Sequence, residues 1–129
     1  MRTDFWFDSC GAGRIHCCKW APEGQPKAVV QIVHGIAEFV ERYETFAEHL
    51  NSLGCVVVAE DHMGHGQSIN GGSKQGYFQG GWFAAVDDSY KLLRDTQAAY
   101  PGVPYILLGH SMGSFMARTI LCKYPESGI

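Results

Sequence analysis

A serine between two glycines is the first feature of this 129-residue sequence that points to chemistry. Gly109-His110-Ser111-Met112-Gly113 has the pattern Gly-x-Ser-x-Gly, and it joins a stretch typical of a buried strand to one typical of a helix. In that setting a tight turn projects the serine hydroxyl, and a side chain at either glycine would collide with backbone. The helix N-terminus favours the negative oxygen of acyl transfer. The pattern predicts Ser111 as a nucleophile; a glycine-rich turn with an incidental serine is the less favoured alternative.

The elements around this motif alternate between short apolar strands and amphipathic helices. Strands are expected over residues 28–33, 55–59 and 105–108, and helices are expected to begin near residues 43, 82 and 111. This alternation indicates an α/β fold with a mostly parallel sheet flanked by helices. Residues 1–27 are expected to form an antiparallel hairpin, so the chain would be one portion of a single domain, with a hairpin (1–27) before a parallel α/β part (28–129).

Three segments in the same order resemble the monoacylglycerol lipase and lysophospholipase family of α/β-hydrolases. They are VVQIVHGIAEFVERYETFAEHLNSLG (29–54), VVVAEDHMGHGQS (56–68) and ILLGHSMGSFMA (106–117), and matching stretches cover most of residues 28–125. One departure is Ser114, where the family commonly has another glycine. The resemblance implies a serine hydrolase that cleaves carboxylic esters of the monoacylglycerol or lysophospholipid type through an acyl-enzyme. It implies no cofactor, and it identifies the substrate partner as a small acyl ester or lipid.

The segment His34-Gly35-Ile36-Ala37-Glu38 directly follows the first parallel strand. In α/β-hydrolases, one N–H group of the oxyanion hole comes from such a loop and the other from the residue after the nucleophile. We therefore expect the backbone N–H groups of Ile36 and Met112 to hold the oxyanion, with His34, Gly35, Gly109, His110 and Gly113 as motif support. His34 is equally compatible with a histidine satisfied by local backbone. His62 and Phe39 are further candidates for shaping the acyl site.

The partners that a serine nucleophile needs are missing from the family's positions. The order in this fold is Ser, then Asp or Glu, then His, yet only Glu126 and no histidine follow Ser111. The last residues resemble the approach to a sixth strand, so we expect an N-terminal half that ends before it and lacks the cap. A non-catalytic hydrolase-fold fragment that binds or associates is the alternative function. Residues 105–108 would then be an exposed sheet edge that favours self-association, and the missing cap is where peripheral membrane contact is expected.

Composition excludes several other classes of protein. The formal charge of −3, from 10 basic and 13 acidic residues, argues against a nucleic-acid site built on phosphate neutralisation. No apolar run approaches the roughly 18 residues of a membrane span, and the N-terminus lacks signal-peptide features. Five cysteines, an odd number, favour reduced buried thiols in a cytoplasmic protein over a disulfide framework.

Two segments offer alternatives to the hydrolase site. Asp61, His62 and His65 have a spacing that suits zinc or iron, but the neighbouring glycines favour a structural turn, so we expect no metal. Gly11-Ala12-Gly13 lacks the third glycine of a nucleotide-binding turn and precedes a strand-like run where such a turn is followed by a helix. A nucleotide site is therefore the weaker of the two alternatives.

Overall fold

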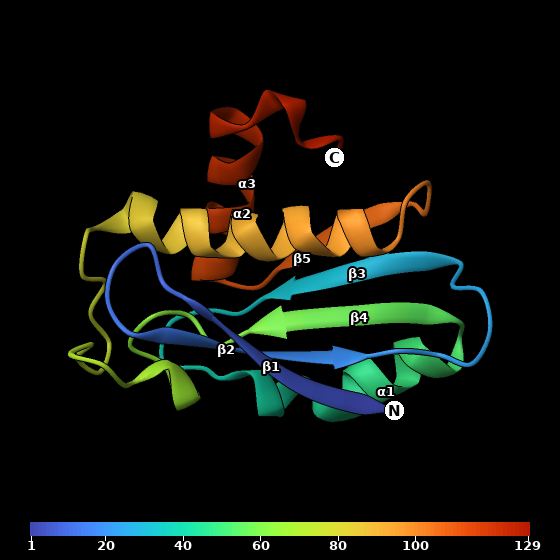
Figure 1. Cartoon of the computed structure of the whole chain (residues 1–129), viewed down its shortest axis with the longest axis horizontal. Helices are drawn as coiled ribbons and strands as arrows, with labels where there is room; N and C mark the ends of the chain where they lie inside the picture. Colours follow the sequence, from blue (N-terminus) through green and yellow to red (C-terminus); the bar gives the residue numbers. More distant parts are fainter.

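Five strands form one mixed sheet in the computed structural model, which describes residues 1–129. The antiparallel hairpin consists of β1 (Arg2–Asp8) and β2 (Arg14–Trp20), and the parallel strands are β3 (Ala28–Val33), β4 (Cys55–Glu60) and β5 (Tyr105–Gly109). The strand order is β1-β2-β4-β3-β5, and β2 pairs antiparallel with β4 (Figure 1). The expected mostly parallel sheet with an antiparallel start is confirmed.

Helices cover both faces of this sheet. They are α1 (Glu44–Ser52), α2 (Trp82–Ala99) and α3 (Met112–Lys123), with short 3-10 turns η1 (Val40–Tyr43), η2 (Gly66–Ser68) and η3 (Pro125–Ser127). Tyr43, expected at the start of the first helix, lies instead in η1. On α3, Met116 and Ile120 are buried, whereas Phe115 and Leu121 are exposed. None of the helices has the length and apolarity to cross a bilayer.

The alternation of side chains along the strands explains how the two faces are filled. Cys18 packs with Trp20, Val57 and Ala47 on the α1 side, while its neighbour Cys17 packs with residues of the α2 side. β3 and β4 are covered on both faces, which is why their sequences are almost continuously apolar. All five cysteines are free thiols. The expectation that they are buried is wrong for Cys10 and Cys122, which are exposed.

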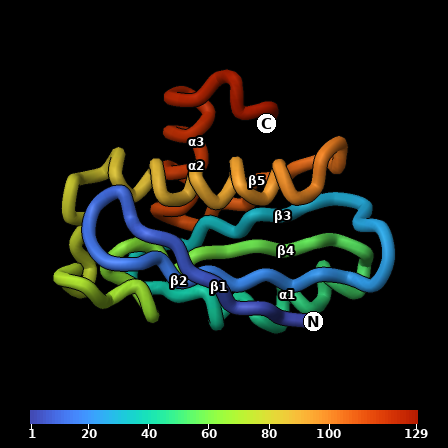
Figure 2. Tube along the Cα trace, viewed as in Figure 1, coloured from blue at the N-terminus to red at the C-terminus, as the bar shows by residue number.

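The carboxyl ends of the parallel strands meet at one edge of the sheet. Figure 2 shows the long loop after β4 (residues 61–81) at this end, next to the turn between β1 and β2. The contact is close, because a Cβ atom on Gly71 would lie 2.8 Å from the Cα atom of Gly13. Val33 and Gly109 are neighbours across β3 and β5, so the segments that follow them leave the sheet side by side. This edge therefore gathers the segments that the sequence analysis singled out.

β5 is an edge strand of the sheet, and it is apolar. Its outer side has no paired strand, and the side chain of Ile106 is 49% exposed. Unpaired backbone N–H and C=O groups beside an exposed apolar side chain are a template for pairing with another chain.

We predict that the 129-residue chain self-associates through β5. Sedimentation velocity should show a size that increases with protein concentration, and Ile106→Lys should shift the distribution towards monomer because charge on an edge strand opposes pairing. Leu53→Lys, at an exposed position after α1, is the matched control and should leave association unchanged. A monomer at every concentration would contradict the prediction.

Candidate functional site

Ser111 lies in the turn that joins β5 to α3, in a conformation that side chains rarely adopt. Its φ and ψ are 55° and −122°, and its side chain is exposed. The turn is possible because both flanking glycines lack a Cβ atom. A Cβ on Gly113 would overlap the carbonyl oxygen of Val33, and one on Gly109 would lie 2.7 Å from the Cα atom of Ser114. The two glycines thus let α3 pack against the ends of β3 and β5.

The loop after β3 passes directly beside this turn. A Cβ on Gly35 would lie 3.0 Å from the Cβ atom of Ser111 and 3.1 Å from the carbonyl oxygen of His110. The backbone N–H of Ile36, the next residue, makes no hydrogen bond within the protein, whereas the Gly35 N–H donates to the Glu38 carboxylate. The structure therefore brings the expected oxyanion loop within contact distance of the expected nucleophile.

The N-terminus of α3 supplies the second expected donor. Gly113 N–H and Ser114 N–H donate to the carbonyl oxygens of His110 and Ser111, at 2.9 Å each. Met112 is the first residue of the helix, where an N–H group has no partner within the helix. The N–H groups of Ile36 and Met112 thus have no partner within the protein, which leaves both free for the expected role as oxyanion donors. The hydroxyl group of Ser114, the residue that departs from the family pattern, donates a hydrogen bond to the Ser111 carbonyl oxygen at 2.6 Å.

A groove of about 360 Å³ adjoins the oxyanion loop, lined by residues that include Ile36, Phe39, His65 and Ile69. Ile36, Phe39 and Ile69 are exposed apolar side chains. A larger groove of about 590 Å³ between α2 and α3 contains none of the predicted site residues. Since the smaller groove includes Ile36 itself, it is the better candidate for holding an apolar part of a substrate.

Glu38 clamps the two loops together, a role that the sequence analysis missed. Its Oε1 atom accepts hydrogen bonds from Gly35 N–H at 2.6 Å, from the Tyr43 hydroxyl at 3.0 Å and from His110 Nδ1 at 2.9 Å. Burial opposes ionisation of this carboxyl, but the three donors outweigh it and lower the pKa of Glu38 to about 2. The imidazole of His110 is therefore held by Glu38.

Two buried histidines join the loops that follow β3 and β4. His34 Nδ1 donates to the Gly35 carbonyl at 2.7 Å, and its Nε2 accepts from His62 N–H at 3.0 Å. His62 Nε2 in turn donates to the His34 carbonyl at 2.8 Å, and the two rings lie 3.8 Å apart. Burial lowers the pKa of His34 to about 2 and that of His62 to about 4, so both imidazoles are neutral near pH 7. His34 is thus satisfied by local backbone, and it supports the loop without contacting Ser111.

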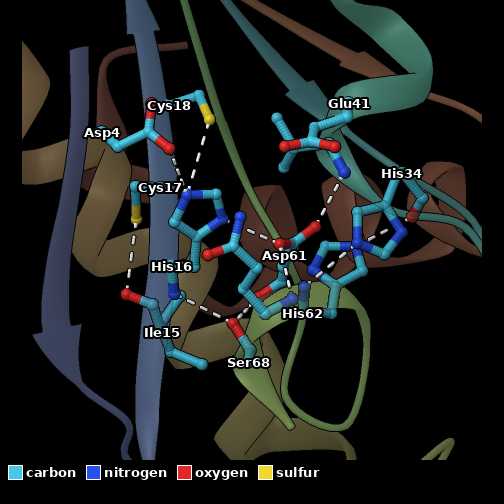
Figure 3. Close-up of polar contacts among 12 residues, drawn as sticks. Asp4, Ile15, His16, Cys17, Cys18, His34, Glu41, Asp61, His62 and Ser68 are labelled. Carbon is cyan, nitrogen blue, oxygen red and sulfur yellow. Dashed lines mark hydrogen bonds and ion pairs between the residues drawn. The ribbon is translucent and has the colours of Figure 1, made fainter.

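Asp61, at the end of β4, is the centre of a buried polar cluster (Figure 3). Its Oδ1 atom accepts from Val40 N–H at 2.7 Å, and its Oδ2 atom accepts from His16 Nδ1 at 2.8 Å and Gln67 N–H at 3.0 Å. His65 Nδ1 bonds to the Met63 carbonyl. The carboxylate of Asp61 is engaged in structural contacts, and Asp61, His62 and His65 do not form a cluster of metal-ligand size.

Glu60 is a second buried acid that sequence reasoning did not identify. Ser89 Oγ donates to its Oε1 atom, which lies 3.6 Å from His62 Nδ1, while its Oε2 atom has no partner. Burial raises the pKa of Glu60 to about 8, and the nearby Asp61 adds to the effect. Glu60 therefore holds its proton at neutral pH. The strand expected over residues 55–59 extends by one residue in the structure, which places Glu60 at the buried last position of β4.

The six histidines form no catalytic base for Ser111 within this chain. His16, His34, His62 and His65 are buried in contacts with other groups, and His110 pairs with Glu38. His49 is exposed on α1, on the face of the sheet opposite α3. None of the six histidines is therefore hydrogen-bonded to Ser111.

Comparisons with known proteins show which family this chain resembles. A hydrolase family model described as serine aminopeptidase, S33, matches residues 24–129. The chain is 40% identical over 119 residues to the monoglyceride lipase homolog of Monkeypox virus, covering 87% of this chain and 39% of that protein. It is 39% identical over 118 residues to the monoglyceride lipase of Homo sapiens, covering 86% and 35%.

The fold comparison gives the same result. A thermostable carboxyl esterase from Bacillus coagulans superposes with a TM-score of 0.85 at 30% identity, covering 98% of this chain and 41% of the esterase. The chain thus spans about two fifths of the length of the proteins it resembles.

We predict that Glu38→Gln destabilises the protein by about 1–3 kcal/mol, because an amide loses the charge that strengthens three hydrogen bonds. Urea unfolding at pH 7 measures the change. Glu48→Gln, at an exposed position on α1, is the matched control and should leave the midpoint unchanged. Equal midpoints for the two variants would show that Glu38 does not hold the loops.

A second prediction concerns pH. Because the folded protein raises the pKa of Glu60 from 4.5 to about 8, its neutral form is favoured in the fold, and the associated stability is fully present below pH 4.5. This stability declines as pH rises towards 8, by up to about 1.4 kcal/mol per pH unit. His34 and His62, whose pKa values the fold lowers, add stability as pH rises to about 6.5, so the Glu60 decline is isolated between pH 6.5 and 8. In that range, Glu60→Gln should remove the decline in urea unfolding.

Glu23→Gln, in the exposed loop before β3, is the control for this series and should follow the unmodified protein at every pH. A Glu60→Gln variant with the same pH dependence as the unmodified protein would refute the assignment of a protonated Glu60.

Proposed function

Since this chain belongs to the α/β-hydrolase family described as serine aminopeptidase, S33, we propose that the protein at its full natural length is a serine hydrolase of carboxylic esters. The observation that carries this proposal is the strained Ser111, exposed at the N-terminus of α3, with the loop bearing Ile36 packed against its turn. Strain of this kind, at a cost of about 1–3 kcal/mol, persists where surrounding structure holds it and is typical of reactive sites.

The chemistry follows from the positions of these groups. Ser111 Oγ attacks the acyl carbon of an ester, and the carbonyl oxygen becomes an oxyanion that the N–H groups of Ile36 and Met112 stabilise. Collapse of this intermediate releases the alcohol and leaves an acyl-enzyme, which water then hydrolyses to the free acid. A histidine must take and return the serine proton, and an acid must orient that histidine. We assign both to residues beyond the 129 described.

Monoacylglycerols or lysophospholipids are the substrates that we propose. The curated relatives that support this choice are named monoglyceride lipases, and the Bacillus coagulans esterase was solved in complex with glycerol. The groove beside Ile36 and Phe39 has exposed apolar side chains suited to an acyl chain. No metal or organic cofactor takes part in this proposal.

A non-catalytic function is the second candidate, and one observation favours it. None of the six histidines is hydrogen-bonded to Ser111, so these residues by themselves provide no base. In that case the chain acts by binding or by association through β5.

The test compares Ser111→Ala with Ser52→Ala, an exposed serine at the end of α1, in the full-length protein. With p-nitrophenyl butyrate as substrate, Ser111→Ala should lower kcat on the order of 10⁶-fold, while Ser52→Ala leaves it unchanged. A fluorophosphonate should label Ser111 and no other serine. Full-length protein that neither turns over nor is labelled would support the non-catalytic function.

The isolated 129-residue chain, verified by its intact mass, should show almost no turnover, because it lacks a histidine in the family's position. Turnover by this chain that Ser111→Ala abolishes would mean that one of its own histidines, or one from a second copy, acts as the base.

A further inference from the structure

Three potential metal ligands converge on the β1–β2 hairpin, away from Ser111. Asp4 and Cys18 are directly opposite each other across the two strands, and His16 lies two residues before Cys18 on the same face. His16 Nε2 is 2.8 Å from Asp4 Oδ2 and 3.8 Å from Cys18 Sγ, and the three ligand atoms all lie within 4.8 Å of one another. Figure 3 shows the three side chains pointing toward one another.

The spacing of the Cys18 sulfur and the His16 nitrogen fits a tetrahedral ion. With Zn–S near 2.3 Å and Zn–N near 2.0 Å, a sulfur and a nitrogen on adjacent corners of a tetrahedron are about 3.5 Å apart. The observed separation of 3.8 Å between Cys18 Sγ and His16 Nε2 needs only a few tenths of an ångström of adjustment. His16 and Cys18 are almost fully buried, whereas the Asp4 side chain is 40% exposed and leaves a path from solvent.

The imidazole of His16 is already oriented for such a ligand. Its Nδ1 atom is held by Asp61 Oδ2 at 2.8 Å, which directs Nε2 towards Asp4 and Cys18. A carboxylate behind a histidine in this way is the usual outer partner of a metal-bound imidazole. Carboxylate oxygens only accept hydrogen bonds, so Nε2 carries a proton while it bonds to Asp4.

The charges around the hairpin also suit a cation. Arg2 lies at the site, donating to both oxygens of Asp4 at 2.9 and 3.0 Å. The same guanidinium also pairs with Glu41 at 3.2 Å and with Glu44 at 2.7 Å. Three carboxylates thus surround one guanidinium, and Asp61 adds a fourth carboxylate behind His16. Asp4 can keep its Oδ1 bond to Arg2 when Oδ2 binds an ion.

We propose that Asp4, His16 and Cys18 bind a Zn²⁺ ion that ties the hairpin to the turn at Asp61. The ion takes the place of the proton on His16 Nε2 and of the thiol proton of Cys18, and both protons pass to solvent. A water molecule completes the tetrahedron. The site is structural, and it does not depend on the esterase activity proposed above. It departs from the expectation of no metal, because the sequence spacing drew attention to Asp61, His62 and His65 instead.

Cobalt(II) replaces zinc as a visible probe in the test. Titration of the purified chain, with a reductant that does not bind metals, should produce a saturable thiolate-to-cobalt absorption band with the d–d bands of a tetrahedral ion. Zn²⁺ should abolish these bands and raise Tm, since an ion that binds only the folded state stabilises it. The Cys17→Ala variant should retain the bands, because Cys17 faces the opposite side of β2, and Cys18→Ala should lose them.

Asp4→Asn is a second variant, for the case in which Cys18→Ala does not fold. Asp4 is partly exposed, so this substitution should leave the folded state intact. It should weaken cobalt binding by at least about tenfold. Absence of a saturable band would overturn the proposal, as would a band that persists in Cys18→Ala or is unchanged in Asp4→Asn. In those cases Cys18 is a small buried side chain of the core and nothing more.

Discussion

The carboxylate of Asp61 is the interaction on which the rest of this structure depends. It is buried at the end of β4, and it accepts hydrogen bonds from three segments that are far apart in the sequence: Val40 N–H, Gln67 N–H and the imidazole of His16. A buried charge is costly unless donors surround it, so this carboxylate fixes the positions of all three segments relative to β4. The hairpin, the loop after β3 and the long loop after β4 are thereby held at one end of the sheet.

The position of the candidate site depends on the contacts of Asp61. Val40 follows the loop that bears Ile36, so holding its N–H limits where the loop can go. From the other side, Glu38 ties the same loop to His110, the residue before Ser111. The geometry beside Ser111 is thus set by two buried carboxylates with different partners, and neither of them is hydrogen-bonded to the serine. Tight packing at Gly35 and Gly113 then removes the remaining freedom between the loop and α3.

Two buried glutamates in this protein, Glu38 and Glu60, have opposite protonation states at neutral pH. The groups around each carboxyl, and not the residue type, decide its pKa. Glu38 accepts three hydrogen bonds, and its pKa falls to about 2. Glu60 is enclosed with one hydroxyl donor and an unpartnered oxygen, and its pKa rises to about 8. The first acts as a charged clamp, whereas the second behaves as a neutral polar group within the core.

Sequence alone determined the main elements and the strained turn at Ser111. The apolar runs of β3, β4 and β5 predicted buried parallel strands because such strands are covered on both faces, and the Gly-x-Ser-x-Gly pattern predicted the strained turn because only glycine permits its close contacts. These signals are local, so they can be read without knowing which segments meet.

Only the tertiary structure decided which polar side chains act together. The pairs Glu38 with His110, Asp61 with His16, and Asp4 with Cys18 are separated by 14 to 72 positions in the chain, and Asp4 meets Cys18 through the strand register. No periodicity connects such residues, because their contacts arise from the order of strands and from loops converging at one end of the sheet. For the same reason the metal-like spacing of Asp61, His62 and His65 was misleading, since hydrogen bonds to backbone and to His16 occupy that carboxylate. The physical reason is that a polar group's role depends on the partners available after folding, and the sequence specifies those partners only through the fold.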